Sequence, residues 1–168
     1  MRELLDHLAR HEPKTIPLPA GAPFGALSIN KQTCTLCKAC IGACPESALI
    51  DSTETPALRF IERNCVQCGL CEATCPEDAI KLSPRLLLTP AVREARVLNE
   101  TQPFHCVSCN KAFGTRQMVD AMLGRLAGHS MFANDGALRR LQMCADCRVV
   151  DMMASKNEVS VLRLGADS

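Results

Sequence analysis

The sequence predicts an α+β protein with a small domain of two repeated halves and a second, mainly helical module. Three observations lead to this fold class. A cysteine pattern that starts at Cys34 starts again at Cys65, and short apolar segments flank each copy. Apolar residues at helical spacing lie between two further cysteine pairs. The short segments favour paired strands, whereas the longer periodic stretches favour helices.

Length and composition limit the size of the core. The chain has 168 residues, enough for one domain and a modest second one. Hydrophobic residues make up 47% of it, but aromatic residues only 3%, with no Trp and no Tyr. We therefore expect a core built from aliphatic side chains or organised around inorganic clusters.

Residues 1–25 are expected to form a short helix and a linker. Leu4, Leu5 and Leu8 give Arg2–Arg10 an amphipathic helical spacing. The Pro- and Gly-rich stretch up to Gly25 is incompatible with a helix or a central strand. This beginning leaves open that the chain is a fragment of a longer protein.

Eight of the twelve cysteines form the two copies of one ligand pattern. Both copies read Cys-x2-Cys-x2-Cys-x3-Cys-Pro, and they end at Pro45 and Pro76. Three thiolates at this spacing wrap one loop around an iron–sulfur cubane, and the fourth is aimed away from that loop. The cysteines are Cys34, Cys37, Cys40 and Cys44 in the first copy, and Cys65, Cys68, Cys71 and Cys75 in the second.

The segments around each copy predict the elements of the repeat. Ala26–Ile29 and Leu58–Ile61 lead into the two cysteine loops, and Ala48–Ile50 and Ala79–Leu82 lead out, all as short paired strands. The last part of each loop, Cys40–Cys44 and Cys71–Cys75, predicts a helical turn that the proline stops. The apolar neighbours expected to shield the clusters are Leu36, Ile41, Val66 and Leu70.

The two copies resemble the bacterial-type ferredoxins with two [4Fe-4S] clusters, over residues 26–83. The resemblance implies a ferredoxin-like domain whose two strand–helix–strand halves are related by a pseudo-two-fold axis and exchange their fourth cysteines. One cluster is then bound by Cys34, Cys37, Cys40 and Cys75, and the other by Cys65, Cys68, Cys71 and Cys44. The departure is a slightly long connection between Cys44 and Cys65, which leaves the ligands unchanged.

Residues 84–103 are expected to connect the two modules. Pro90–Glu100 reads as a polar helix, and its apolar residues, from Ala91 to Leu98, leave room for a packing stripe.

The remaining four cysteines lie in residues 104–168 and form two Cys-x2-Cys pairs: Cys106, Cys109, Cys144 and Cys147. Two such pairs present four thiolates tetrahedrally, which predicts one structural zinc ion. The alternatives are a third iron–sulfur cluster, and thiols that are unliganded or bound in one pair only; His105 is a less favoured substitute ligand. Between the pairs, Thr115–Ala127 predicts a helix with Thr115 as its N-cap, and Asp135 is expected to cap a second short helix carrying Leu138 and Leu141.

These features predict an electron carrier, not an enzyme. The chain has no phosphate-binding glycine loop, nucleotide fingerprint or nucleophile–base pair. Metal-ligating cysteines require a reducing compartment, and no export signal or membrane-spanning segment is visible, so we expect a cytoplasmic protein. We expect it to pass single electrons between redox protein partners that the sequence does not identify. Residues 84–168 carry eleven basic and eight acidic side chains, which indicates solvated surface or a docking face for an acidic partner.

The alternative is an accessory or electron-transfer subunit of a larger dehydrogenase-type complex, in which the four-cysteine module docks the chain on its partner. A regulatory protein that binds nucleic acid is a third reading. It is disfavoured because the second pair has few arginines near it, chiefly Arg139, Arg140 and Arg148.

Overall fold

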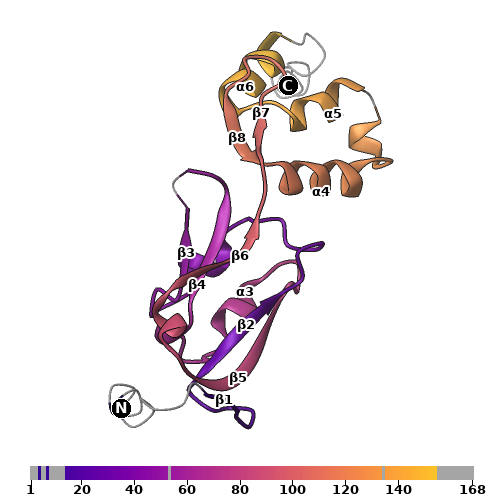
Figure 1. The fold of residues 1–168 in the computed structure, drawn as a ribbon. Helices are drawn as coiled ribbons and strands as arrows, with labels where there is room; N and C mark the ends of the chain where they lie inside the picture. Colours follow the sequence, from indigo (N-terminus) through magenta and orange to yellow (C-terminus); the bar gives the residue numbers. More distant parts are fainter. Residues whose placement is uncertain (1–3, 5–6, 8–13, 53, 134, 155–168) are drawn as a thin grey trace, which may run out of the picture. The chain divides into compact units, whose positions relative to one another are not determined.

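The computed structural model describes residues 4, 7, 14–52, 54–133 and 135–154 (Figure 1). The chain divides into two compact units, Met1–Thr101 and Gln102–Ser168. The first unit holds the eight cysteines of the two copies and the second unit holds the other four, and the two units are described separately below.

The first sheet of the first unit has β5 as its central strand. Strand β5 (Ile80–Leu88) pairs antiparallel with β2 (Gly25–Ile29) along its first half and with β1 (Lys14–Pro17) along its second half. The stretch ahead of Gly25 was expected to be a linker, but part of it forms the edge strand β1. Pro17 is tolerated there because an edge strand leaves backbone positions unpaired.

The second sheet has the order β3–β4–β6. Strand β4 (Ala57–Ile61) pairs antiparallel with β3 (Leu49–Asp51) on one side and with β6 (Ala95–Glu100) on the other. The four strands predicted around the cysteine loops are confirmed as β2, β3, β4 and the first half of β5.

The prediction of a connecting helix in residues 84–103 is wrong. The structure has the end of β5, a 3-10 turn at Pro90–Arg93 and then strand β6. The apolar residues of this stretch fit helical spacing, but the free edge of β4 offers backbone hydrogen bonds and a surface that buries Leu98 and Asn99. Tertiary pairing outweighs local propensity here.

The backbone of the first unit repeats with the same offset as the cysteines. Ile29 lies opposite Ile80 in the first sheet, and the equivalent pair in the second sheet is Phe60 opposite Leu49. Left-handed backbone conformations also recur in equivalent pairs: Leu36 and Gln67, Lys38 and Gly69, Ser47 and Asp78.

The helical part of each cysteine loop is a single turn. Helix α2 (Ala39–Gly42) follows the second cysteine of the first copy, and α3 (Leu70–Thr74) follows that of the second. Both turns are as the sequence predicts. The helix predicted over Arg2–Arg10 lies almost wholly outside the described residues.

Aliphatic side chains and cysteines share one core in the first unit. The fully buried members are led by Phe60, Leu49, Leu58 and Ile80, and the same cluster includes Cys40, Cys65 and Cys71. Burying each large side chain contributes about 1.5–3 kcal/mol. The core of this unit is thus packed directly against the cysteine loops.

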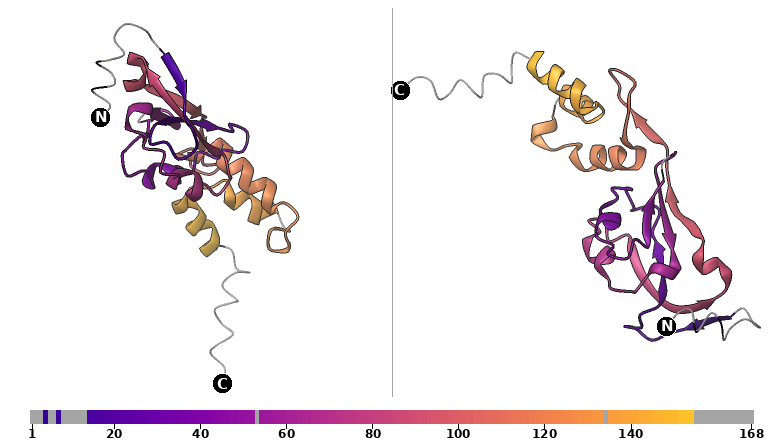
Figure 2. Two further views of the ribbon diagram at one scale, coloured as in Figure 1. Left: turned by 90° about the horizontal axis from the view of Figure 1, so that it is seen from below. Right: turned by 90° about the vertical axis from the view of Figure 1, so that its left-hand side faces the viewer.

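The second unit begins with a β-hairpin and continues with short helices, the orange and yellow segments of Figure 2. The predicted helix after Thr115 is confirmed, and the Thr115 side chain accepts a hydrogen bond from the backbone N–H of Met118 as its N-cap. The elements are β7 (Pro103–His105), β8 (Ala112–Thr115), α4 (Arg116–Leu126), a 3-10 turn (Ser130–Phe132), α5 (Asp135–Leu141) and α6 (Ala145–Ala154).

Candidate iron–sulfur and metal sites

Cysteines from both copies line one cavity of the first unit. Three come from the first loop and one from the end of the second, together with the apolar side chains of Leu36, Leu58 and Ile80. We call Cys34, Cys37, Cys40 and Cys75 the first cluster site.

A second cavity has the reciprocal composition. Three of its cysteines come from the second loop and one from the end of the first, with Leu27, Leu49 and Leu82 among its apolar walls. We call Cys65, Cys68, Cys71 and Cys44 the second cluster site. The structure therefore brings together the sequence-predicted residues in two groups of four, each with thiols from both copies.

Burial and neighbouring thiols keep the central cysteines neutral in the metal-free chain. Burial raises the pKa of Cys40 to about 12, and the nearby thiols of Cys34, Cys37, Cys71 and Cys75 add to the effect. Burial likewise raises the pKa of Cys71 to about 11. These groups hold their protons at neutral pH, so binding of a cluster as thiolates releases them.

Backbone N–H groups point at the fourth cysteine of each copy. The N–H of Ala48 donates to Cys44 Sγ at 3.3 Å, and the N–H of Ala79 donates to Cys75 Sγ at 3.4 Å. Together with the left-handed residues in the loops, these N–H groups resemble the backbone nests that bind anionic groups, iron–sulfur clusters among them.

The four side chains expected to shield the clusters differ in burial, although Leu36 lines the first cavity and Val66 the second. Leu36 is buried at 4% exposure, and Ile41 is half-buried. Val66 and Leu70 are instead 46% and 49% exposed. The second loop therefore presents an apolar surface beside the exposed Cys68.

An ion pair between a buried Glu62 and a partly exposed Arg85 lies next to the second loop. Glu62 accepts two hydrogen bonds from the Arg85 guanidinium, at 2.9 and 2.6 Å, and its backbone carbonyl accepts from the N–H of Cys65. The pairing raises the pKa of Arg85. Sequence reasoning missed this pair because its members are far apart in the chain and belong to no motif.

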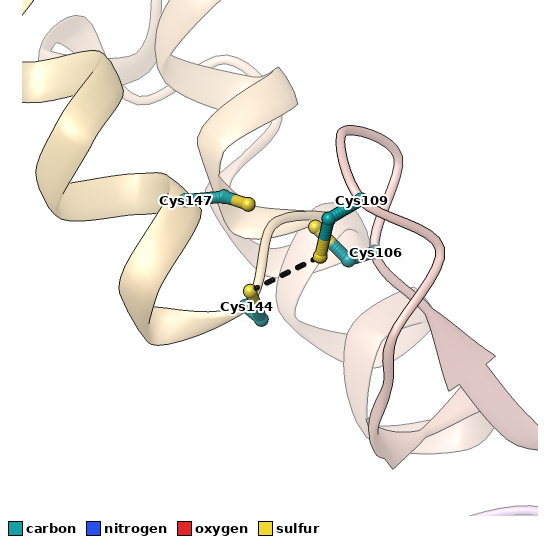
Figure 3. Close-up of side chains that lie close together, drawn as sticks. All are labelled: Cys106, Cys109, Cys144 and Cys147. Atoms are coloured by element: carbon teal, nitrogen blue, oxygen red, sulfur yellow. Dashed lines mark hydrogen bonds between the residues drawn. The ribbon is translucent and has the colours of Figure 1, made fainter.

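The third cysteine group lies in the second unit, where the two Cys-x2-Cys pairs meet (Figure 3). All four Sγ atoms lie within 4.8 Å of one another, and Cys109 Sγ is 3.7 Å from Cys144 Sγ. Ligands of one tetrahedral zinc ion, with Zn–S bonds of about 2.3 Å, are separated by about 3.8 Å. The donor set and its spacing therefore fit a single metal ion. We call Cys106, Cys109, Cys144 and Cys147 the four-cysteine site.

The first pair sits in the turn of the β7–β8 hairpin. The N–H of Cys106 donates to Lys111 O, the N–H of Asn110 donates to Cys106 O, and Asn110 has a left-handed φ of 59°. The N–H of Ser108 donates to Cys106 Sγ at 3.4 Å. This closed turn is the knuckle that the Cys-x2-Cys spacing predicts.

The second pair lies at the start of α6, with Cys144 just ahead of the helix and Cys147 in its first turn. Arg148 donates hydrogen bonds to Arg140 O and Met143 O, at 3.0 and 3.1 Å. Its guanidinium thus ties the end of α5 to the backbone that leads into Cys144. Sequence reasoning counted Arg148 only among the few arginines near the second cysteine pair.

The protein environment favours the thiolate form of Cys106. Burial raises its pKa, but hydrogen bonds from the backbone N–H groups of Cys109, Cys144 and Ser108 outweigh burial, so that the pKa of Cys106 is lowered. His105 is exposed and lies outside the group of four sulfurs, so it is not a ligand in this arrangement.

Comparison with known protein families found a match within the first unit. Residues 33–80 match the model of a family described as a 4Fe-4S dicluster domain. The match covers less than a third of the chain and supports iron–sulfur binding there. No curated protein matches the chain. Within the part of the chain that the structure describes, no helix has the length and apolarity needed to cross a membrane.

Proposed function

We propose that the protein is an electron carrier that passes single electrons through two [4Fe-4S] clusters. The observation that carries the proposal is the pair of cavities, each lined by three cysteines of one copy and one of the other. A match to a dicluster family supports it. The repeated strand register and left-handed residues support a pseudo-two-fold axis between the halves.

The chain's own residues have three tasks in this function. Eight cysteines supply a full set of four ligands to each cluster, which leaves no open iron position for substrate chemistry. The aliphatic core and the N–H donors of Ala48 and Ala79 surround the thiolates. Cys37 and Cys68 are exposed, so each cluster has one edge through which an electron can reach a redox protein partner.

Paired cysteine substitutions test the crossed ligand sets. In Cys44→Ala/Cys68→Ala both changes fall on the second cluster site, so we expect about four irons per chain and one intact cluster signal by electron paramagnetic resonance. In Cys37→Ala/Cys44→Ala each site loses one ligand, so both clusters should be damaged. The reverse result would show that each copy binds its own cluster and would refute the crossed sets.

We propose that the four-cysteine site binds one structural zinc ion. A cluster of two or four irons places sulfides between its metals, which moves the cysteine sulfurs further apart than the ligands of one ion. The closeness of all four Sγ atoms therefore favours a single ion. Metal analysis of the anaerobically purified chain should find about one zinc beside about eight irons. About twelve irons and no zinc would instead indicate a third cluster.

A second candidate function is that of a subunit of a larger oxidoreductase, docked through the second unit. The exposed apolar side chains on α6, at Val149, Val150 and Met153, favour it. Size-exclusion chromatography of a native extract separates the two functions, since a free carrier elutes near its own mass of 18.2 kDa. In either case we propose protein redox partners and a reducing, cytoplasmic location.

A further inference from the structure

The two cluster loops differ at one equivalent position. Leu36 in the first loop and Gln67 in the second each stand just ahead of the second cysteine of their copy. Their backbones agree closely, with left-handed φ angles of 53° and 54°. The leucine side chain is buried and apolar, whereas the glutamine carries an amide into the wall of the second cavity. The two halves of the repeat thus place different side chains, Leu36 and Gln67, on nearly the same backbone conformation.

The Gln67 amide donates a hydrogen bond to a cluster ligand. Its Nε2 lies 3.2 Å from Cys65 Sγ and 3.1 Å from the backbone oxygen of Ala26. Both neighbours are acceptors once Cys65 is a thiolate. The reversed amide would bring Oε1 against two acceptors, so the chemistry of the neighbours sets the orientation.

This orientation leaves the other end of the amide without a partner. Gln67 Oε1 is buried and accepts no hydrogen bond from the described residues, and an unpaired buried acceptor destabilises the folded chain. Gly25 leaves space for the Gln67 amide, because a Cβ at position 25 would lie 2.5 Å from Gln67 Cδ. A leucine, as in the first loop, would avoid the orphaned acceptor. A buried unpaired group in a native protein requires an explanation, and a redox role is one.

We infer that Gln67 raises the reduction potential of the cluster in the second cluster site above that of the cluster in the first. Reduction adds one electron and increases the negative charge on the cluster and its thiolates. A hydrogen bond to Cys65 Sγ stabilises that charge, and hydrogen bonds to sulfur are among the factors that set cluster potentials. A single electron delivered by a redox partner then resides on the cluster in the second cluster site. The loop of that site also presents the exposed Val66 and Leu70.

The inference rests on the proposed two-cluster function, and an exchange of the two side chains tests it. Anaerobic redox titration of the whole chain should show two one-electron steps. Gln67→Leu should lower the reduction potential of the upper step by about 59 mV, which corresponds to a tenfold change in the equilibrium constant of a one-electron step. The reduction potential of the lower step should not change. The matched variant Leu36→Gln should raise the lower step alone. A shift of the lower step by Gln67→Leu, an equal shift of both steps, or none would overturn the inference.

Two further measurements separate a failed fold from a failed inference. Gln67→Met, unbranched and similar in length to glutamine, repeats the test if the leucine variant does not retain its iron. Resonance Raman spectra in deuterium oxide should show Fe–S(Cys) bands whose isotope shift is smaller in Gln67→Leu than in the native chain, and an unchanged shift would overturn the inference. Native chain with fewer than about eight irons would refute the proposed function itself, whereas unmoved steps at full iron content would refute only the role of Gln67.

Discussion

At the scale of single residues, Glu62 places a carboxylate in the interior of the first unit at 3% exposure. Arg85 binds it through two hydrogen bonds, and Arg96 lies 3.9 Å away while its guanidinium stacks over the Phe60 ring. A buried carboxylate that loses its partner costs far more than an exposed pair that loses one. The group therefore anchors the entry to the second cysteine loop.

We expect Arg85→Leu to destabilise the first unit by about 3 kcal/mol, at the lower end of the usual range because Arg96 remains nearby. The measurement is the concentration of the denaturant guanidinium chloride at which the visible absorbance of the clusters bleaches under anaerobic conditions. The control is Lys81→Met, which removes an exposed partner of Glu72 and should leave the midpoint almost unchanged. Equal midpoints for the two variants would contradict the anchoring role of the buried pair.

At the scale of elements, two side-chain contacts fix the ends of helices in the second unit. The Thr115 side chain caps α4, and the Arg148 guanidinium joins the end of α5 to the start of α6. Neither residue is a ligand, so changes at both should act through helix position.

For the cap, we expect Thr115→Ala to lower stability by about 1 kcal/mol, because the N–H of Met118 loses its acceptor. Urea denaturation followed by circular dichroism measures the change. Thr115→Ser keeps the hydroxyl and should restore most of the loss. If the serine variant is as unstable as the alanine variant, the threonine methyl matters and the cap does not.

For the Arg148 contacts, we expect Arg148→Met to weaken zinc binding by about tenfold. This is the low end of the effect of residues that orient metal ligands. Competition with a chromophoric chelator measures the affinity. Arg139→Met is the matched control, since this exposed arginine of α5 faces Asp151 at 3.9 Å. Equal affinities of the two variants would show that the Arg148 contacts do not position Cys144.

At the scale of the whole molecule, the ligands proposed for each metal lie within one unit. The first and second cluster sites lie in Met1–Thr101, and the four-cysteine site lies in Gln102–Ser168. Loss of one kind of metal should therefore leave the other in place.

We expect Cys109→Ser to lose zinc and keep about eight irons, and Cys68→Ala to lose iron and keep zinc. Cys109→Ser should also lower the urea midpoint of the second unit, because the unfolded chain has no preformed site and metal binding contributes directly to folding. Metal analysis of both variants is the measurement. Loss of iron from Cys109→Ser would show that the two units depend on each other.

The sequence alone predicted the four short strands, the helical turns and the helix that Thr115 caps, because each depends on residues close together in the chain. The grouping of the cysteines around metals stays a prediction. The tertiary structure decided the rest. Pairing with β4 turned the expected connecting helix into β6, and pairing with β5 drew residues 14–17 into a sheet. Gln67, the Glu62–Arg85 pair and Arg148 also acquire their roles through partners distant in sequence or set by packing. Local patterns record spacing and propensity, whereas strand edges and buried partners exist only once the chain has folded.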